Sequence, residues 1–187
     1  MKNAFIIHGS YGHPKENWFP WLKNELEKLN YKVFVPAFPT PRNQSLDSWL
    51  KIFQDYEQYL NAETIMIGHS LGPAFILNIL ERINNPIKSC YFVSGFIGLL
   101  NNKEFDDINK TFVDKNFNWK KIKQNCQNFY IYHSDNDPYV SMEKADELAK
   151  KLNAKIKLIK GAGHFNVNSG YTEFEELLDL IKKQDDF

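Results

Sequence analysis

Residues 63–72, with the sequence ETIMIGHSLG, decide the fold of this chain. The apolar residues 65–67 are typical of a buried strand. They lead into residues 68–72, which fit the pattern G-x-S-x-G, and an apolar, helix-like stretch follows over residues 73–83. A strand, this pentapeptide and a helix are together the context of a nucleophile elbow, a sharp turn that lifts one serine hydroxyl above the edge of a sheet. The pattern predicts Ser70 as a nucleophile, and the alternative is a structural serine in a strand-to-helix turn.

The composition predicts one ordered domain over residues 1–187. Of the 187 residues, 43% are hydrophobic and 15% aromatic, which suits a sizeable core and argues against disorder. Lys plus Arg and Asp plus Glu number 23 each, so the net charge gives no basis for binding nucleic acid or an anionic membrane surface. The two cysteines form neither a disulfide framework nor a zinc motif and suit a reducing compartment. No stretch has the length of a transmembrane helix or the make-up of a signal peptide, so we expect a soluble, cytoplasmic protein.

Strand-like and helix-like segments alternate along the chain. The expected strands are residues 4–7, 31–35, 65–67, 87–93, 129–132 and 155–159. The expected helices are residues 14–30, a segment from an N-cap at Ser45 to residue 60, and residues 73–83, 141–152 and 171–182. This alternation predicts an α/β fold: a three-layer sandwich of about six mostly parallel strands with helices on both faces.

Residues 96–127 are the longest stretch without a strand signal. They mix aromatic and apolar residues with Asn, Asp and Lys, and they follow the fourth expected strand. A small lid over a pocket belongs at such a place, and a pair of connecting helices is an equal alternative. Phe96, which opens the stretch, is a candidate pocket residue.

A nucleophilic serine needs a base, and only His133 and His164 lie downstream of Ser70. The order Ser, then Asp or Glu, then His is the order of the triad on the α/β-hydrolase scaffold. His133 closes the fifth strand, whereas His164 follows the last strand in a glycine-containing loop that can turn back towards the elbow. We therefore expect His164 to be the general base.

The acid should lie at the carboxyl end of the fifth strand, where catalytic groups gather in open α/β sheets. Asp135 and Asp137 both lie there. Pro138 favours an extended backbone at Asp137, which would project its carboxylate from the loop. Asp135 is better suited to a local turn hydrogen bond, so we favour Asp137 as the acid.

Two backbone N–H groups should form the oxyanion hole. One is that of Leu71, directly after the nucleophile, and the other should come from the loop after the first strand. Ser10 is the first candidate there and Tyr11 the second. Tyr11 and His13 are further pocket candidates, and a position on the surface of the loop is at least an equal alternative for His13. No His pair has the spacing of metal ligands, so we expect neither a metal nor a cofactor.

These residues resemble those of the small α/β-hydrolases similar to retinoblastoma-binding protein nine and the bacterial YdeN-like proteins. The resemblance rests on residues 8–10, Trp18 and Trp21, residues 68–72, residues 135–138 and residues 163–165, and it spans nearly the whole chain. It implies a trimmed hydrolase sheet with Ser70, Asp137 and His164 as a catalytic triad. It also implies a serine hydrolase.

The sequence therefore predicts a cofactor-independent, carboxylesterase-like serine hydrolase that cleaves a small ester, amide or thioester through an acyl-enzyme. The alternative is a hydrolase-fold module that binds a protein partner with little turnover, for which the aromatic richness would serve as a contact surface. Turnover of an ester discriminates between the two.

Overall fold

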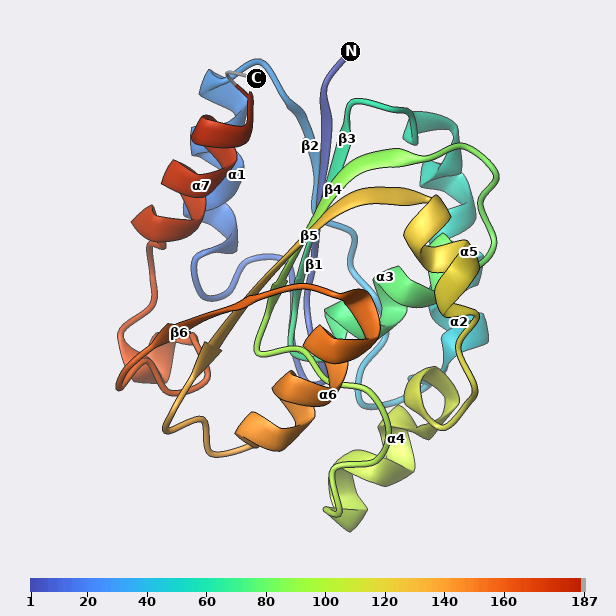
Figure 1. The fold of residues 1–187 in the computed structure, drawn as a ribbon, viewed down its shortest axis with the longest axis vertical. Coiled ribbons are helices and arrows are strands. Elements are labelled where there is room, and N and C mark those ends of the chain that lie inside the picture. Colours follow the sequence, from blue (N-terminus) through green and yellow to red (C-terminus); the bar gives the residue numbers. More distant parts are fainter. Residues whose placement is uncertain (186–187) are drawn as a thin grey trace.

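The computed structural model describes residues 1–185 and contains one sheet of six strands, all parallel (Figure 1). The strands are β1 (Asn3–Ile7), β2 (Lys32–Phe34), β3 (Thr64–His69), β4 (Ile87–Val93), β5 (Cys126–Ser134) and β6 (Ile156–Ile159). Their order across the sheet is β2-β1-β3-β4-β5-β6, which confirms the expected α/β architecture. The elbow strand β3 lies in the interior of the sheet, between β1 and β4.

Helices cover both faces of this sheet. The helices α1 (Phe19–Lys28) and α7 (Glu175–Asp185) pack on one face. The other face is covered by α2 (Leu46–Phe53), α3 (Gly72–Leu80), α5 (Trp119–Gln124) and α6 (Met142–Leu152). Successive side chains of a strand point to opposite faces of the sheet. In β3, Ile65 and Ile67 pack towards α1 and α7, whereas Met66 packs towards α3. Every residue of α3 is buried, as expected for a helix that is apolar all round.

Several element boundaries differ from those predicted, most of all the starts of the first and last helices. The first helix begins at Phe19 rather than near residue 14, because Pro20 fits only the first turn of a helix. The last helix begins at Glu175 rather than near residue 171, after the short 3₁₀ helix η2 (Val167–Ser169). β5 begins at Cys126, three residues earlier than predicted. The predicted N-cap Ser45 does cap α2, with its hydroxyl accepting from the Ser48 N–H, and η1 (Gln54–Tyr59) continues this segment as a 3₁₀ helix.

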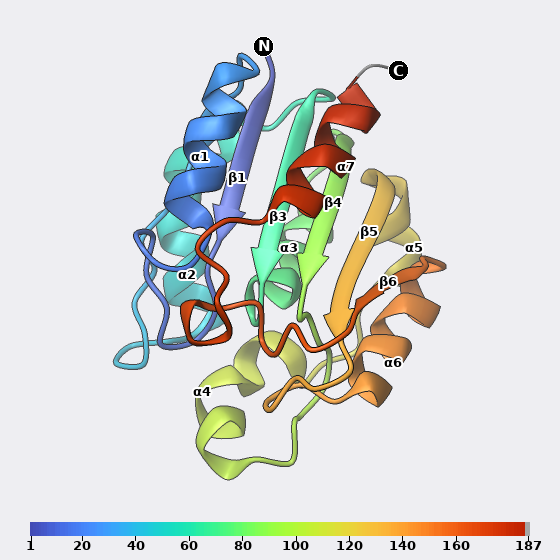
Figure 2. The same cartoon turned by 90° about the vertical axis from the view of Figure 1, so that its left-hand side faces the viewer.

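The stretch 96–127 contains two helices, and they lie in different places. α5 packs beside β5, whereas α4 (Lys103–Val113) lies beyond the carboxyl ends of the strands, as Figure 2 shows. Both the loop after β1 and the elbow after β3 open at that same edge. α4 is therefore the element that faces the elbow.

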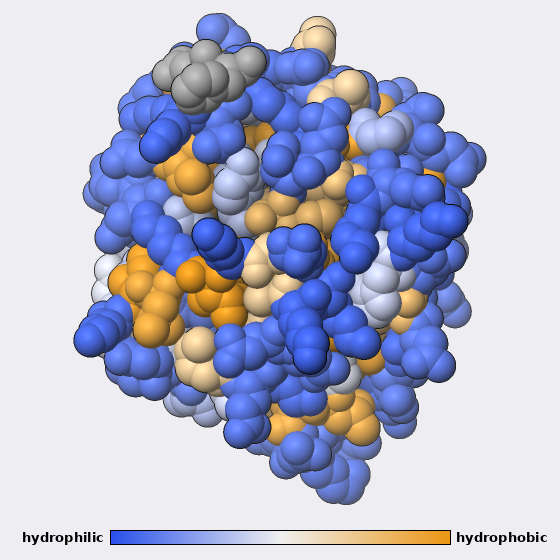
Figure 3. Space-filling model, viewed as in Figure 1, coloured by the Kyte–Doolittle hydropathy of each residue, from blue (hydrophilic) through white to orange (hydrophobic). Residues whose placement is uncertain are grey.

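Hydrophilic and apolar side chains are unevenly distributed on the face drawn in Figure 3. Most of this face is hydrophilic, and apolar side chains gather on it where Figure 1 places β6, the edge strand that carries the exposed Leu158. Within residues 1–185, no helix combines the length and apolar character needed to cross a bilayer.

Candidate active site

Ser70 occupies a strained turn between β3 and α3. Its φ angle is 58°, in the left-handed region that a non-glycine residue seldom adopts. The turn is held by the Ser70 N–H, which donates to the carbonyl of Val93 at 2.9 Å. A Cβ added to Gly72 would lie 2.4 Å from the carbonyl oxygen of Ile7, so the turn requires glycine there. The geometry is that of a nucleophile elbow.

The loop after β1 packs directly against this serine. A Cβ on Gly9 would lie 2.6 Å from the Ser70 Cβ, so Gly9 permits the close approach. His8 fixes the loop from the other side: its Nδ1 donates to the Gly9 carbonyl at 2.8 Å, and its Nε2 accepts the N–H of Phe38 at 3.1 Å. Burial lowers the pKa of His8, so its ring stays neutral in this role.

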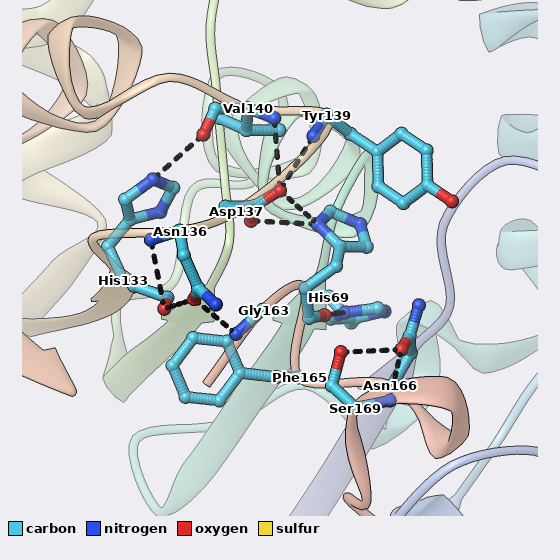
Figure 4. Close-up of polar contacts among 12 residues, drawn as sticks. His69, His133, Asn136, Asp137, Tyr139, Val140, Gly163, Phe165, Asn166 and Ser169 are labelled. Carbon is cyan, nitrogen blue, oxygen red and sulfur yellow. Dashed lines mark hydrogen bonds and ion pairs between the residues drawn. The ribbon is translucent and has the colours of Figure 1, made fainter. Parts of the chain in front are cut away.

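Asp137 and His164 form a short pair. The Nδ1 of His164 lies 2.8 Å from Oδ2 and 3.0 Å from Oδ1 of Asp137 (Figure 4). Oδ1 also accepts the backbone N–H groups of Tyr139 and Val140, at 2.9 and 3.1 Å. Burial alone would raise the pKa of Asp137, but the His164 ring and these N–H groups lower it below its ordinary value. The carboxylate is thus ionised and holds Nδ1 of the imidazole as the donor.

The two loops that carry this pair are tied together by the neighbours of Asp137. Asn136 Oδ1 accepts the N–H of Gly163 at 2.8 Å, and Asp135 Oδ1 accepts the N–H of Gly161 at 2.8 Å. Asp135 therefore braces the adjacent loop rather than its own turn, which differs from the local hydrogen bond expected from the sequence. The motif Asp135-Asn136-Asp137 places each of its three side chains on the loop of His164.

His69 holds the same loop from below. Its Nε2 donates to the carbonyl of His164 at 2.7 Å, and the two rings lie 4.8 Å apart. Burial, followed by the nearby His164 ring, lowers the pKa of His69 to about 3, so this ring is neutral and positions its neighbour. Trp18 adds a further tie through its Nε1, which donates to the carbonyl of Phe165 at 3.0 Å.

A pocket of about 240 Å³ opens above the elbow and contains both Ser70 and His164. Within the described residues the structure gives no hydrogen bond between the Ser70 hydroxyl and the His164 ring, so the two share the pocket without a direct bond. Such bonds are often long in unliganded enzymes and tighten when substrate binds. The carboxyl group of Glu16 lines the pocket, and no Lys or Arg is among the lining residues of the part that the structure describes.

The other predicted site residues divide into two groups. Ser10, Tyr11 and Phe96 line the pocket, and Leu71 follows Ser70 directly at the start of α3. His13, predicted to line the pocket, is not among its lining residues; its side chain is 62% exposed and lies beside Glu16 on the outer side of the loop.

Several residues of the site carry no signal in the sequence. Gln44, Thr40 and Asn109 contact the loop after β1 from remote parts of the chain, and Glu16 and Tyr139 enter the pocket lining. Before the fold is known, the G-x-S-x-G pattern, Pro138 after Asp137 and the glycines around His164 point to the site. Between residues 1 and 185 no cluster of three or more His, Cys, Asp or Glu has the arrangement of a metal site.

Comparison with known proteins identifies the family. A sequence model described as "Serine hydrolase" matches residues 4–183. YdeN of Bacillus subtilis (strain 168) is 28% identical over 96% of this chain and 94% of its own length, and the serine hydrolase RBBP9 of Rattus norvegicus is 26% identical over 96% and 93%. The crystal structure of the B. subtilis ydeN gene product superposes with a TM-score of 0.93 at 26% identity, covering both chains fully. Est1E of Butyrivibrio proteoclasticus, in a structure described as having ferulic acid bound, shares the fold, with a TM-score of 0.75 at 16% identity over 100% of this chain and 90% of its own. The chain belongs to the serine hydrolase family and is an α/β-hydrolase enzyme.

Proposed function

We propose that this enzyme cleaves small esters, amides or thioesters through an acyl-enzyme on Ser70. The observation that carries the proposal is the pocket shared by Ser70 and His164, with the Nδ1 of His164 bound to the buried carboxylate of Asp137 at 2.8 Å. With Nδ1 engaged as a donor, the basic lone pair of the ring is on Nε2. His164 can therefore take the proton of the Ser70 hydroxyl and later activate the water that hydrolyses the acyl-enzyme.

Two backbone N–H groups are the proposed oxyanion donors. The N–H of Leu71 stands at the N-terminus of α3, where free N–H groups and the positive end of the helix dipole favour negative charge. Ser10, in the loop after β1, lines the same pocket, and its N–H is the proposed second donor. Loss of one such donor typically costs 10²–10³-fold in kcat.

The size of the pocket favours a small substrate. Its volume of about 240 Å³ lies below the range of roughly 300–1,000 Å³ that is usual for drug-sized ligands. α4 and the segment before it contribute apolar walls through Phe96, Leu100 and Phe105. These apolar walls favour a short apolar acyl group. We propose that α4 acts as the lid over this group, within a single domain.

The experiment is the turnover of 4-nitrophenyl butyrate by the wild type, Ser70→Ala and His164→Ala. We expect wild-type turnover with a burst of nitrophenol equal to the enzyme concentration when deacylation is slow, and a loss of at least 10³-fold in kcat in either variant. Equal rates in the wild type and Ser70→Ala would overturn the proposal.

The alternative of a protein-binding module gains no support from the aromatic residues. Trp18 and Trp49 are fully buried, and Trp21 and Trp119 are only partly exposed. The tryptophans therefore serve mainly the core, and the exposed Tyr11 and Tyr139 belong to the pocket lining. We infer that the partner of the site is a small molecule.

A further inference from the structure

A closed hydrogen-bond network joins three remote segments beside Ser70. The Ser10 hydroxyl donates to Asn109 Oδ1 of α4 at 2.6 Å. The Gln44 side-chain amide donates to Asn109 Oδ1 at 2.8 Å and to the Ser10 hydroxyl oxygen at 3.1 Å. The Thr40 hydroxyl donates to Gln44 Oε1 and accepts the backbone N–H of Tyr11 at 2.6 Å. Residues 10–11, 40–44 and α4 are thus locked together at the rim of the pocket.

The orientation of each amide in this network follows from one carbonyl. Gln44 Nε2 also reaches the backbone carbonyl of Ile108 at 3.1 Å, and a carbonyl can only accept, so this atom must be the amide nitrogen. The atom of Asn109 that faces Gln44 Nε2 must then be its oxygen. Asn109 is 2% exposed, so reversing either amide would leave buried donors facing donors. The network has one low-energy arrangement.

This arrangement determines which N–H of the loop after β1 has no hydrogen-bond partner among the described residues. The Tyr11 N–H is engaged by Thr40, and the Gly12 N–H donates to the carbonyl of Gly9 at 3.2 Å. Among residues 10–12, Ser10 alone has an N–H without a hydrogen-bond partner in the described part of the chain. Tyr11 also adopts a φ of 59°, a left-handed conformation that a tyrosine keeps only when its surroundings hold it.

We propose that Gln44 and Asn109 are positioning residues that fix the Ser10 N–H as the second oxyanion donor, so that docking of α4 completes the oxyanion hole. The proposal rests on the proposed function of Ser70 and adds to it a structural condition for full activity. Gln44 is not in the pocket lining and cannot touch the substrate. An effect of Gln44 on the transition state must therefore pass through its partners Ser10 and Asn109, which both line the pocket.

A second set of contacts joins α4 to the loops around the reacting centre. The Tyr11 hydroxyl donates to Glu104 of α4 at 2.8 Å, and the Tyr11 ring meets the Phe105 ring edge-on with 5.9 Å between centroids. Phe105 in turn contacts Tyr139, whose ring lies 4.9 Å from that of His164. One turn of α4 therefore touches the loops on both sides of the reacting centre.

The test compares Gln44→Met, which keeps the length of the side chain and removes every hydrogen bond, with Gln54→Met on the exposed end of α2 as the matched control. With 4-nitrophenyl butyrate we expect Gln44→Met to lose about 10–100-fold in kcat with KM changed less than threefold, because the oxyanion exists only in the transition state. A trifluoromethyl ketone that mimics the tetrahedral intermediate should lose affinity by a similar factor, whereas butyrate, the product, should not. Gln54→Met should match the wild type in all three measurements.

A double-mutant cycle with Ser10→Ala separates positioning from general loss of stability. If Gln44 acts through Ser10, the double variant should be hardly slower than the slower single variant. Multiplicative losses in kcat, or a Gln44→Met variant that melts at lower temperature but keeps wild-type kcat below its melting range, would overturn the inference and leave the proposed function standing. A wild type that neither turns over the ester nor reacts with a fluorophosphonate would instead overturn the proposed function, and this inference with it.

Discussion

Asp137 shows how much of the site depends on a single side chain. Its carboxylate accepts from the His164 ring and from two backbone N–H groups, those of Tyr139 and Val140. An amide at this position must direct its NH₂ group at one of these donors. The carboxylate therefore fixes both the tautomer of His164 and the course of its own loop.

We expect Asp137→Asn to lower kcat by roughly 10²–10⁴-fold, because the imidazole loses the acceptor that orients it and stabilises its charged form. Asp135→Asn is the matched control: its retained Oδ1 can still accept the Gly161 N–H, so its kcat should stay within about threefold of the wild type. Steady-state kinetics on 4-nitrophenyl butyrate measures both. Equal losses in the two variants would show that the loop, and not the carboxylate of Asp137, controls the rate.

The site residues could be predicted from the sequence only where the type of residue and its order along the chain both fit a catalytic triad. The G-x-S-x-G pattern singled out Ser70, and Pro138 and the glycines singled out the loops of Asp137 and His164. By contrast, nothing in the sequence shows that the ring of His69 reaches the carbonyl of a residue 95 positions away. Such contacts depend on tertiary structure and have no local signal.

Among the secondary-structure elements, the elbow between β3 and α3 determines where the site lies. Residues around it are packed so closely that backbone touches backbone, as the Gly72 position shows. All six strands were predicted, and β1, β3 and β4 have the clearest signal because buried parallel strands are continuous in apolar residues. Helix starts were predicted less well, since a proline such as Pro20 is compatible with both a break and a first turn.

We predict that Gly72→Ala lowers the free energy of unfolding by about 2–3 kcal/mol or more, because its Cβ would lie 2.4 Å from the Ile7 carbonyl oxygen and β1 would have to shift. Gly161→Ala is the comparison, because its φ is 72° and no atom lies within 4 Å of the added Cβ. It should cost only about 1–2 kcal/mol of backbone strain. Urea unfolding midpoints give both values, and a Gly72→Ala protein as stable as Gly161→Ala would contradict the packing described for the elbow.

At the scale of the whole molecule, the pocket carries a charge preference. Glu16 is the carboxylate in its described lining, and burial, the main cause, raises the pKa of Glu16 against a smaller lowering by the backbone and the ring of His13. An anionic acyl group would meet this carboxylate in a partly desolvated space. Neutral and cationic acyl groups should therefore be preferred.

Glu16→Gln should raise kcat/KM for mono-4-nitrophenyl succinate relative to 4-nitrophenyl butyrate by about 3–10-fold at low ionic strength, and by less at high salt. The exposed Glu57→Gln, at the opposite end of the molecule, should leave the ratio unchanged. A ratio of kcat/KM values that changes with neither the Glu16→Gln substitution nor the salt concentration would rule out charge selection by Glu16.

The stability of the molecule should also depend on pH through its buried histidines. His69 has a pKa of about 3 in the folded protein against 6.5 for a free imidazole, and burial also lowers the pKa values of His8 and His133. The unfolded chain therefore binds protons that the folded chain does not. The contribution of such a histidine is complete above pH 6.5 and is lost as the pH falls towards its folded pKa, by about 1.4 kcal/mol per pH unit.

His69→Gln keeps a nitrogen donor for the His164 carbonyl but cannot be protonated. We expect its unfolding free energy to fall less steeply than that of the wild type between pH 6.5 and 4, as measured by urea unfolding at several pH values. His13→Gln, on the exposed loop, serves as the control. Parallel pH profiles for the wild type and His69→Gln would refute this assignment.

The whole-molecule view also explains why the network around Ser10 could not be predicted. The hydrogen bonds between its three segments span 29 to 99 positions along the chain, and the segments meet only because α4 lies across the carboxyl ends of the strands. The sequence left open whether residues 96–127 form a lid or connecting helices. The structure places α4 across the carboxyl ends of the strands and α5 beside β5.

The central claim, that Ser70 is a nucleophile activated by His164, is tested most directly by mass spectrometry after treatment with a fluorophosphonate. The wild type should gain one phosphonyl group, and peptide mapping should place it on Ser70. Ser70→Ala should gain none, and His164→Ala should react at least 10²-fold more slowly. A wild type that stays unmodified, or that carries the phosphonyl group on another residue, would contradict the account.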